Sequence, residues 1–389
     1  MKFIKANFPL FQTALLVIIL MGITTLLFLY TAGFRLNRDA GKPEIDLGKT
    51  GMISAKSQPE GANVYVDGTL RTATNDTIQG IDPGTYKLEI KKKGYVDWTK
   101  DIEVFAELVT DITAVLISQT PRLEPLTNTG AVAPSVSPTG NKLAFFSKDP
   151  ENPGIWVIPI ESNALNLFRT NPYVVIEDTI ALKYSDGKEI LWSPDEKFLL
   201  VTTISNIKYL INLETRNALV SKDSDQVVAS WEQDVVEKRT ELVSRFDIPQ
   251  EIKNISTSNK TVWAPDDKKI LYTTQNNDVL EYRVYNMEKP LPIGEKVENV
   301  VFTTKASDPQ PKITWYSDSF HLILTEGDVM SAKTGKISII RIDGTNKTEI
   351  FNNVLYSDSV FTAPSGDKII ILTTFKSGDT PNLYTIGIK

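Results

Sequence analysis

The chain has 389 residues, of which 23% are charged and 41% hydrophobic, ordinary values for a globular protein of two or three domains. It contains no cysteine, which excludes disulfides, thiolate nucleophiles and cysteine metal sites. Its single histidine, His321, disfavours a histidine-based metal site or acid–base pair.

Residues 10–32 form an apolar run. From Leu10 to Ala32 the 23 residues carry no charge. At about 1.5 Å rise per residue, a helix of this length crosses a hydrocarbon core of about 30 Å. A cleaved signal peptide is the alternative, but the run is long for one, and Tyr30 stands where a small residue should precede cleavage. The run therefore predicts an uncleaved signal anchor, with residues 1–9 as a cytoplasmic tail and 33–50 as a linker.

Basic residues flank both sides of this run, so they indicate its orientation only weakly. Lys2 and Lys5 precede it, and Arg35, Arg38 and Lys42 follow it. With Lys2 and Lys5 set aside, 40 basic residues face 48 acidic ones, a net charge of −8. Phosphate binding needs clustered basic residues, so this balance disfavours a nucleic-acid partner.

Residues 51–118 contain short alternating strands punctuated by turns. In "TYKLEIK" the side chains of Tyr86, Leu88 and Ile90 face one way and the charged ones the other. Asp67-Gly68 after "NVYV" predicts a hairpin. Several short strands within about 70 residues predict a compact β-sandwich.

Two strings in this segment, "SQPEGANVYVDG" and "GIDPGTYKLEIKKKGY", closely resemble the PEGA domain over residues 53–117. The family's name is spelled by residues 59–62, whereas "NDTI" at 75–78 departs from the usual Thr-Pro. The resemblance implies an exported bacterial or archaeal envelope protein and does not imply an enzyme. We interpret six residues as turn glycines and core aromatics, with ligand binding as the alternative: Gly61, Gly68, Gly84, Gly94, Tyr95 and Trp98.

Five strand–turn–strand phrases recur between residues 135 and 375, among them "ILWSPDEKFLLVTT" and "TVWAPDDKKILYTT". A second apolar run follows each phrase, and weaker segments such as 166–170 could complete a unit. Steps of 56, 71, 52 and 47 residues separate the turn positions, which are Pro138, Pro194, Pro265, Ser317 and Pro364. Units of this length, each with several strands, predict propeller blades.

The phrases resemble TolB-type and WD-like propeller repeats over residues 119–389, although no copy has a complete Pro-Asp-Gly turn. A sixth blade could lie within the 71-residue step or between residues 119 and 135. A ring must close, so we expect residues 122–136 to pair with the C-terminal "NLYTIGIK". The fold prediction is a mainly β chain: a transmembrane helix, a PEGA-like β-sandwich and an irregular β-propeller of about five to six blades.

Trp192, Trp263 and Trp315 each stand two residues before the turn position. A recurring aromatic at one place in several blades predicts packing between blades, and an aromatic platform for sugars is the alternative. The acidic pairs Asp266-Asp267 and Asp223/Asp225 could form carboxylate dyads, but at turn positions we interpret them as solvated acids.

Residues 230–249 break the repeat. Apolar residues fall there on one helical face, at spacings of 4, 11 and 15: Trp231, Val235, Leu242 and Phe246. Ser230 with Gln233 suggests a capping box, and Pro249 suggests an end, so the segment predicts an inserted helix of about 16 residues. It could pack on the side of the propeller or cover an edge strand, or it could dock a partner or a second copy.

The sequence carries no Gly-x-Ser-x-Gly elbow, phosphate-binding loop, His-Glu-x-x-His motif or calcium loop. We therefore expect no enzyme and no catalytic, cofactor or metal residues; the sequence does not identify the binding residues. The leading hypothesis is a membrane-anchored protein with residues 33–389 outside the cytoplasm, which binds an envelope polymer or a protein.

The alternative is an envelope glycan or peptide hydrolase or lyase that uses carboxylates in the propeller's funnel. A funnel lined by converging Asp, Glu, Arg and Tyr would favour the enzyme. A funnel lined by Ser, Thr and Asn would favour the binding protein.

Overall fold

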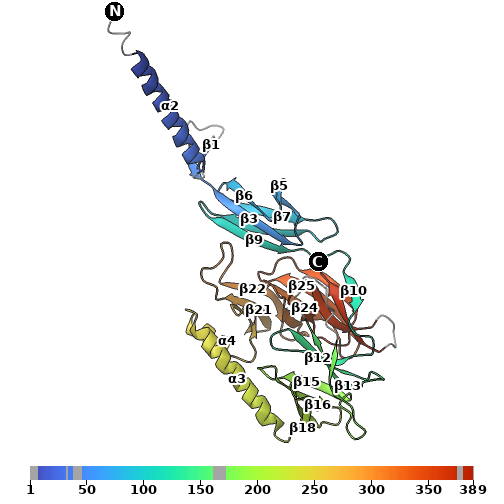
Figure 1. Cartoon of the computed structure of the whole chain (residues 1–389). Coiled ribbons are helices and arrows are strands. Elements are labelled where there is room, and N and C mark those ends of the chain that lie inside the picture. Colours follow the sequence, from blue (N-terminus) through green and yellow to red (C-terminus); the bar gives the residue numbers. More distant parts are fainter. Residues whose placement is uncertain (1–7, 32–33, 38–45, 161–171, 375–379, 389) are drawn as a thin grey trace, which may run out of the picture. The chain divides into compact units, whose positions relative to one another are not determined.

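The computed structural model describes residues 8–31, 34–37, 46–160, 172–374 and 380–388 (Figure 1). Residues 1–7 of the predicted tail (1–9), part of the linker and the predicted weak strand at 166–170 lie outside these residues. Helix α2 (Phe8–Thr31) corresponds to the apolar run, and its segment Gln12–Tyr30 has a mean hydropathy of 2.4 with none of it buried in protein. The helix is long and apolar enough to cross a membrane. A two-stranded hairpin of β1 (Phe34–Asn37) and β2 (Asp46–Lys49) follows it.

The predicted β-sandwich consists of two sheets. The first has the strand order β6 (Asp76–Ile81), β3 (Gly51–Gln58) and β9 (Val109–Val115), with β3 and β9 parallel. The second has the order β5 (Thr69–Ala73), β4 (Asn63–Val66), β7 (Gly84–Lys91) and β8 (Trp98–Val104). Side chains alternate as expected, since Leu88 and Ile90 of β7 are fully buried.

The β4–β5 hairpin turns on Asp67 and Gly68, with φ of 49° and 75°. Positive φ at both central residues is the geometry of a type I′ turn, so the predicted hairpin is confirmed. Of the two aromatics interpreted as core, Trp98 is buried and Tyr95 is only half-buried.

Residues 59–62 form the loop between β3 and β4. Gly61 has a φ of 72°, a left-handed conformation that favours glycine. The next residue, Ala62, is fully buried, and its N–H donates to Thr74 Oγ1 at 3.0 Å while its carbonyl accepts from Thr74 N–H at 2.8 Å. These contacts support a structural role for both residues.

The rest of the chain forms five sheets of four strands among the described residues, coloured from green to red in Figure 1. Each sheet is one blade. From the innermost strand outward, blade 1 is β11 (Val132–Val136), β12 (Lys142–Ser147), β13 (Gly154–Pro159) and β14 (Tyr173–Glu177), and blade 2 is β15 (Gly187–Trp192), β16 (Phe198–Thr203), β17 (Lys208–Asn212) and β18 (Asn217–Val220). In the same order, blade 3 is β19 (Val262–Trp263), β20 (Lys269–Asn276), β21 (Val279–Asn286) and β22 (Glu298–Lys305), and blade 4 is β23 (Lys312–Trp315), β24 (His321–Glu326), β25 (Thr334–Arg341) and β26 (Thr348–Val354). Blade 5 is β27 (Phe361–Thr362), β28 (Lys368–Thr373), β29 (Asn382–Gly387) and β10 (Arg122–Pro125).

Blade 5 closes the ring. Its outermost strand, β10, comes from the start of the propeller and pairs antiparallel with β29, from Arg122 opposite Gly387 to Pro125 opposite Tyr384. The predicted closing pair is therefore confirmed. The described residues contain five blades, and the stretch considered for a sixth between 119 and 135 supplies strands to blades 5 and 1 instead.

Buried side chains join neighbouring blades. Leu199 and Val201 of blade 2 share a cluster with Phe146 and Val157 of blade 1. Equivalent clusters join blade 5 to blade 1 and blade 3 to blade 4. The burial of alternating residues on both faces of each sheet explains why the central strands read as continuous apolar runs.

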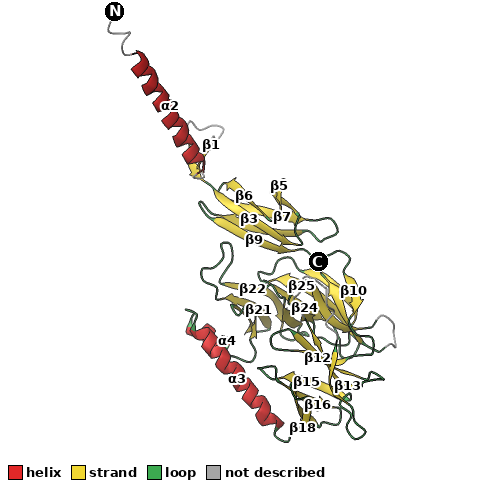
Figure 2. Cartoon of the chain, in the orientation of Figure 1, coloured by secondary structure: helices red, strands yellow, loops and turns green. Residues whose placement is uncertain are grey.

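The insertion between blades 2 and 3 contains two helices, shown in red in Figure 2. Helix α3 runs from Ser224 to Ser244 and helix α4 from Gln250 to Ser256. The predicted start at 230 is wrong, because Ser230 lies inside α3, and Asp223 occupies the N-cap position without a side-chain cap. Ser224 and Asp225 are polar residues suited to a first turn, so the helix extends six residues further toward the N-terminus than the capping pattern suggested.

Candidate functional site: the channel of the propeller

A cavity of about 890 Å³ lies where the innermost strands of the five blades converge. Residues of all five innermost strands line it: β11, β15, β19, β23 and β27. The turns after β11 and β19 also border it, through Pro138 and Pro265. The repeat thus places each of its five copies around one site.

The five turns share a left-handed residue two positions after the aligned turn position. The φ angles there lie between 55° and 74°, and the residues are Gly140, Glu196, Asp267, Ser319 and Gly366. Only two are glycines, although the conformation costs other residues roughly 1–2 kcal/mol. The incomplete Pro-Asp-Gly turns noted in the sequence therefore keep the turn geometry and differ only in the residue that adopts it.

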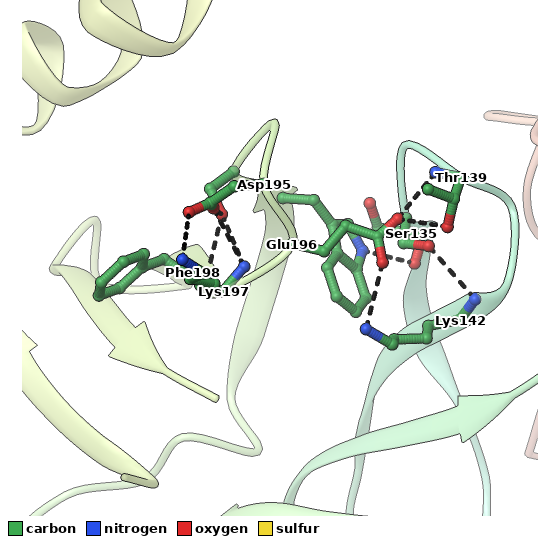
Figure 3. A network of polar contacts seen from close by, with 10 residues as sticks. Ser135, Thr139, Lys142, Asp195, Glu196, Lys197 and Phe198 are labelled. Carbon is green, nitrogen blue, oxygen red and sulfur yellow. Dashed lines mark hydrogen bonds and ion pairs between the residues drawn. The ribbon is translucent and has the colours of Figure 1, made fainter. Parts of the chain in front are cut away.

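At Glu196 the extra side chain binds the preceding blade (Figure 3). Its Oε1 accepts hydrogen bonds from the backbone N–H of Thr139 at 2.8 Å and the hydroxyl of Thr139 at 2.6 Å. Its Oε2 lies 3.1 Å from Lys142 Nζ. Burial acts to raise the pKa of Glu196, but the hydrogen bonds from Thr139, Ser137 and Lys142 together outweigh it, so the pKa is lowered. Glu196 thus joins blades 2 and 1 as a carboxylate.

Ser319 has the same role between blades 4 and 3, since its hydroxyl accepts a hydrogen bond from the N–H of Asp266 at 3.0 Å. Asp195, one position before Glu196, makes its contacts within its own turn instead. Asp195 accepts from Ser193 Oγ at 2.6 Å and from Lys197 N–H at 3.1 Å, and these bonds lower its pKa. The residues one and two positions after the aligned turn position are therefore both engaged in structural contacts.

The three tryptophans each donate the indole N–H to a main-chain carbonyl. Trp192 donates to Ser135 and Trp315 to Val262, each at 3.0 Å and each in the preceding blade. Their side chains are 9% and 4% exposed. These contacts support the prediction of packing between blades.

Trp263 is the exception. It is half-buried and donates to the carbonyl of Ser256, at the end of α4, at 2.8 Å. The insertion therefore occupies the place that blade 2 would hold beside blade 3. A cluster on this side of blade 3 agrees, because Val243 and Ile252 of the insertion pack with Ile270 and Tyr272 of β20.

Neither predicted acidic pair forms a dyad of two free carboxylates. Asp266 Oδ2 lies 2.5 Å from Nζ of the fully buried Lys269, while Asp267 borders the cavity. In the second pair, Asp225 lies 3.2 Å from Lys208 of β17. The buried Lys269 was not anticipated; an acid followed three residues later by a base is the signal that could have revealed it.

Blade 4 repeats this arrangement with the sole histidine. His321 is buried, and its Nδ1 lies 2.7 Å from Asp318 Oδ2. Burial acts to raise the pKa of Asp318, but the charge and hydrogen bonds of His321 outweigh it, so the pKa is lowered. No group of three or more potential metal-ligating side chains occurs among the described residues.

The cavity wall is mostly apolar and hydroxyl-bearing. Six of its residues carry hydroxyls: Ser135, Ser137, Thr139, Thr314, Ser359 and Thr362. Among the described residues that line it, the charged ones are Lys238 of α3, Lys312 of β23 and Asp267. Arginine, glutamate and tyrosine are absent from this lining, so the wall does not have the converging acids expected of a glycosidase.

Residues 50–119 match the family model of the PEGA domain. This segment is similar to the PEGA domain. It accounts for the sandwich, and the resemblance read from residues 53–117 is confirmed. No curated protein matches the chain in sequence.

Comparison with solved structures gives matches of low identity and low TM-score. TolB from Acinetobacter baumannii is 15% identical, with 78% of this chain and 59% of that chain covered and a TM-score of 0.26. Oligogalacturonate lyase from Vibrio parahaemolyticus is 10% identical, with 70% and 95% covered and a TM-score of 0.26. A chain of a mitotic checkpoint complex is 11% identical, with 72% and 98% covered and a TM-score of 0.34. This chain spans 59% of the length of TolB.

Proposed function

We propose that the protein is a single-pass membrane protein whose PEGA domain and propeller lie outside the cytoplasm and bind an envelope polymer or an envelope protein without transforming it. The observation that carries the proposal is the lining of the propeller cavity. Its described residues include six with hydroxyls and three tryptophans, but a single carboxylate, that of Asp267.

Helix α2 supports the membrane anchor. Its 24 residues span about 36 Å at about 1.5 Å each, more than a hydrocarbon core of about 30 Å. Exposed leucine and isoleucine side chains along Gln12–Tyr30 would be unfavourable in water. The PEGA domain supports the extracytoplasmic location, in line with the envelope proteins that this resemblance implies.

The lining supports binding over hydrolysis. Glycoside hydrolysis needs two carboxyl groups at a fixed separation on either side of the reacting bond. Asp267 is the one carboxylate in the described lining, and the other turn acids Asp266 and Glu196, which are not part of that lining, are held by basic or hydroxyl partners. The alternative, a hydrolase or lyase, would need a second carboxylate from elsewhere.

The test uses the full chain in lipid nanodiscs, mixed with a solubilised envelope fraction. Capture of a polymer or protein at unchanged chain length supports binding, whereas shortened products in mass spectrometry would show an enzyme. Thr314→Trp, which fills the cavity, should abolish capture. Thr215→Trp, at an exposed position outside the cavity, should not. Equal capture by both variants would refute a site in the channel.

Location is tested by protease added to intact cells. Degradation of all but a small anchored fragment is expected. Protection of the large fragment, with an outer barrier excluded as the cause, would contradict the proposal.

A further inference from the structure

Lys238 and Lys312 are the two basic residues in the described lining of the cavity, and they come from different parts of the ring. Lys238 belongs to helix α3, between blades 2 and 3, and Lys312 begins the innermost strand of blade 4. Both are exposed. Two cations therefore border one cavity from separate elements.

These lysines differ from those of the repeated turns. Lys142 lies 3.1 Å from Glu196, Lys269 lies 2.5 Å from Asp266, and Lys368 of blade 5 lies 3.3 Å from Glu124. In the part of the chain that the structure describes, neither Lys238 nor Lys312 has a carboxylate partner. The turn lysines are thus neutralised within the fold, whereas the cavity lysines are available to a ligand.

The net charge of the described cavity lining has the opposite sign to the net charge of the chain. Two lysines against Asp267 give the described lining a net positive charge, while the whole chain carries −6. A concave wall of low dielectric strengthens such a local field, which favours a negatively charged ligand.

The neutral part of the lining indicates what else the ligand carries. The hydroxyls of Ser135 and Thr314 can donate to and accept from ligand hydroxyls, and the half-buried Trp263 borders the same space. A peptide would gain most by pairing along an innermost strand, but β19 and β27 are only two residues long. A hydroxyl-rich chain fits this wall better than a peptide.

The cavity is also large and accessible at the insertion. Its volume of about 890 Å³ lies near the upper end of the range for small-molecule sites, which is about 300–1,000 Å³. Leu191 and Val262, which line it from blades 2 and 3, are 39% and 40% exposed. The blades on either side of the insertion therefore leave part of the wall open to solvent beside Lys238.

We propose that this cavity binds an acidic glycan-like chain, a hydroxyl-rich polymer that bears carboxylates or phosphates, and that Lys238 and Lys312 contact two of its anionic groups. This inference rests on the proposed binding function and specifies its ligand. It involves no covalent step.

The experiment measures binding of the full chain in nanodiscs of neutral lipid to four probes of matched length: a polyuronate, a poly(glycerol phosphate), a neutral glycan and polyglutamate. We expect at least one of the first two to bind more tightly than the neutral glycan, and its affinity to fall as salt rises. Which of the two binds more tightly identifies the anionic group as carboxylate or phosphate. Polyglutamate should bind more weakly than the tighter of these two polymers.

Variants then test the two lysines. Lys238→Gln and Lys312→Gln should each weaken binding of the acidic polymer about tenfold, a change of about 1.4 kcal/mol, and together should remove most of its salt dependence. Lys260→Gln is the matched control, because Lys260 is an exposed lysine of the same insertion that does not line the cavity. It should bind like the wild type.

Three results would overturn the inference: a neutral glycan that binds as tightly as the acidic polymers, lysine variants that bind like the wild type, or polyglutamate as the tightest ligand. If envelope material is still captured in those cases, the proposed binding function stands and only its ligand class is wrong. Loss of all capture by the wild-type chain would instead contradict the proposed function.

Discussion

The indole Nε1 of Trp315 in blade 4 donates a hydrogen bond to the main-chain carbonyl of Val262 in blade 3, 3.0 Å away. Trp192 of blade 2 makes the equivalent contact with Ser135 of blade 1. A tryptophan before the turn thus connects the innermost strands of two successive blades, so its replacement should weaken the packing between them.

Trp315→Ala should destabilise the propeller by about 3–5 kcal/mol, because a large buried ring is removed and a cavity is left. Denaturant unfolding measures the change. Trp156→Ala is a control, since Trp156 is half-buried and donates to Asn152 within its own blade, and it should cost less. Unchanged stability of Trp315→Ala together with lost binding of envelope material would favour the sugar platform instead.

Glu196→Ala should cost more than Glu196→Gly. Both lose charge-assisted hydrogen bonds to blade 1, worth about 1.5–3 kcal/mol, but glycine relieves the left-handed φ of 57° by roughly 1 kcal/mol. Thermal melting of the two variants gives the order. Asp267→Gly is the control at the matching turn position, where the described residues offer no carboxylate contact to another blade, and it should stabilise by roughly 1 kcal/mol. Destabilisation by Asp267→Gly would contradict this account.

The propeller should lose stability in acid. The pKa values of Asp318, Asp195 and Glu196 are lowered in the fold. A carboxyl group with a depressed folded pKa contributes stability that is present above its unfolded pKa of about 4 and is lost as pH falls through the folded value. We expect the free energy of unfolding to decline below about pH 4.

Asp318→Asn tests one of these groups, because it removes the carboxylate that His321 contacts. Its stability should depend less steeply on pH below about 4 than that of the wild type, measured by urea unfolding at several pH values. Asp278→Asn, at an exposed turn, should keep the wild-type slope. An identical slope for all three proteins would count against the Asp318 contribution.

The C-terminal end of helix α3 in the insertion should contribute to the stability of the propeller. Val243→Asn places an amide in the buried cluster with Ile270 and Tyr272, so it should cost about 3 kcal/mol. Val235→Asn makes the same change at a half-buried position of α3 and should cost about 1 kcal/mol or less. Melting temperatures compare the two, and equal losses would show that the whole helix packs alike.

Much of the propeller could be predicted from the sequence because each blade repeats a local pattern. The Pro-containing turn and the apolar strand that follows it are signals within about 15 residues, and the closing pair followed from the need to remove free edges. The helix stripe of Trp231, Val235 and Leu242 was also visible, since periodicity is a local property. Its start was missed because Ser230 and Gln233 match a capping box without forming one.

Contacts between blades could not be predicted in the same way. Glu196 and Thr139 are 57 residues apart, and they meet only because the ring places successive turns side by side. Nothing near Trp263 in the sequence indicates that its indole meets Ser256 and not blade 2. The lining of the cavity has the same origin, as it combines innermost strands with Lys238 from an insertion whose place depends on the whole ring.

The pairing of β10 with β29 also constrains the order of events during biosynthesis. Arg122 lies opposite Gly387, so blade 5 is incomplete until β29 has been made. At typical rates of about 5–20 residues per second, the roughly 260 residues between them take tens of seconds to synthesise. Through that interval the face of blade 1 that packs on blade 5, including Leu143 and Phe145, has no partner. A nascent propeller of this kind is exposed to aggregation until β29 is made, and a premature stop before β29 would leave it permanently open.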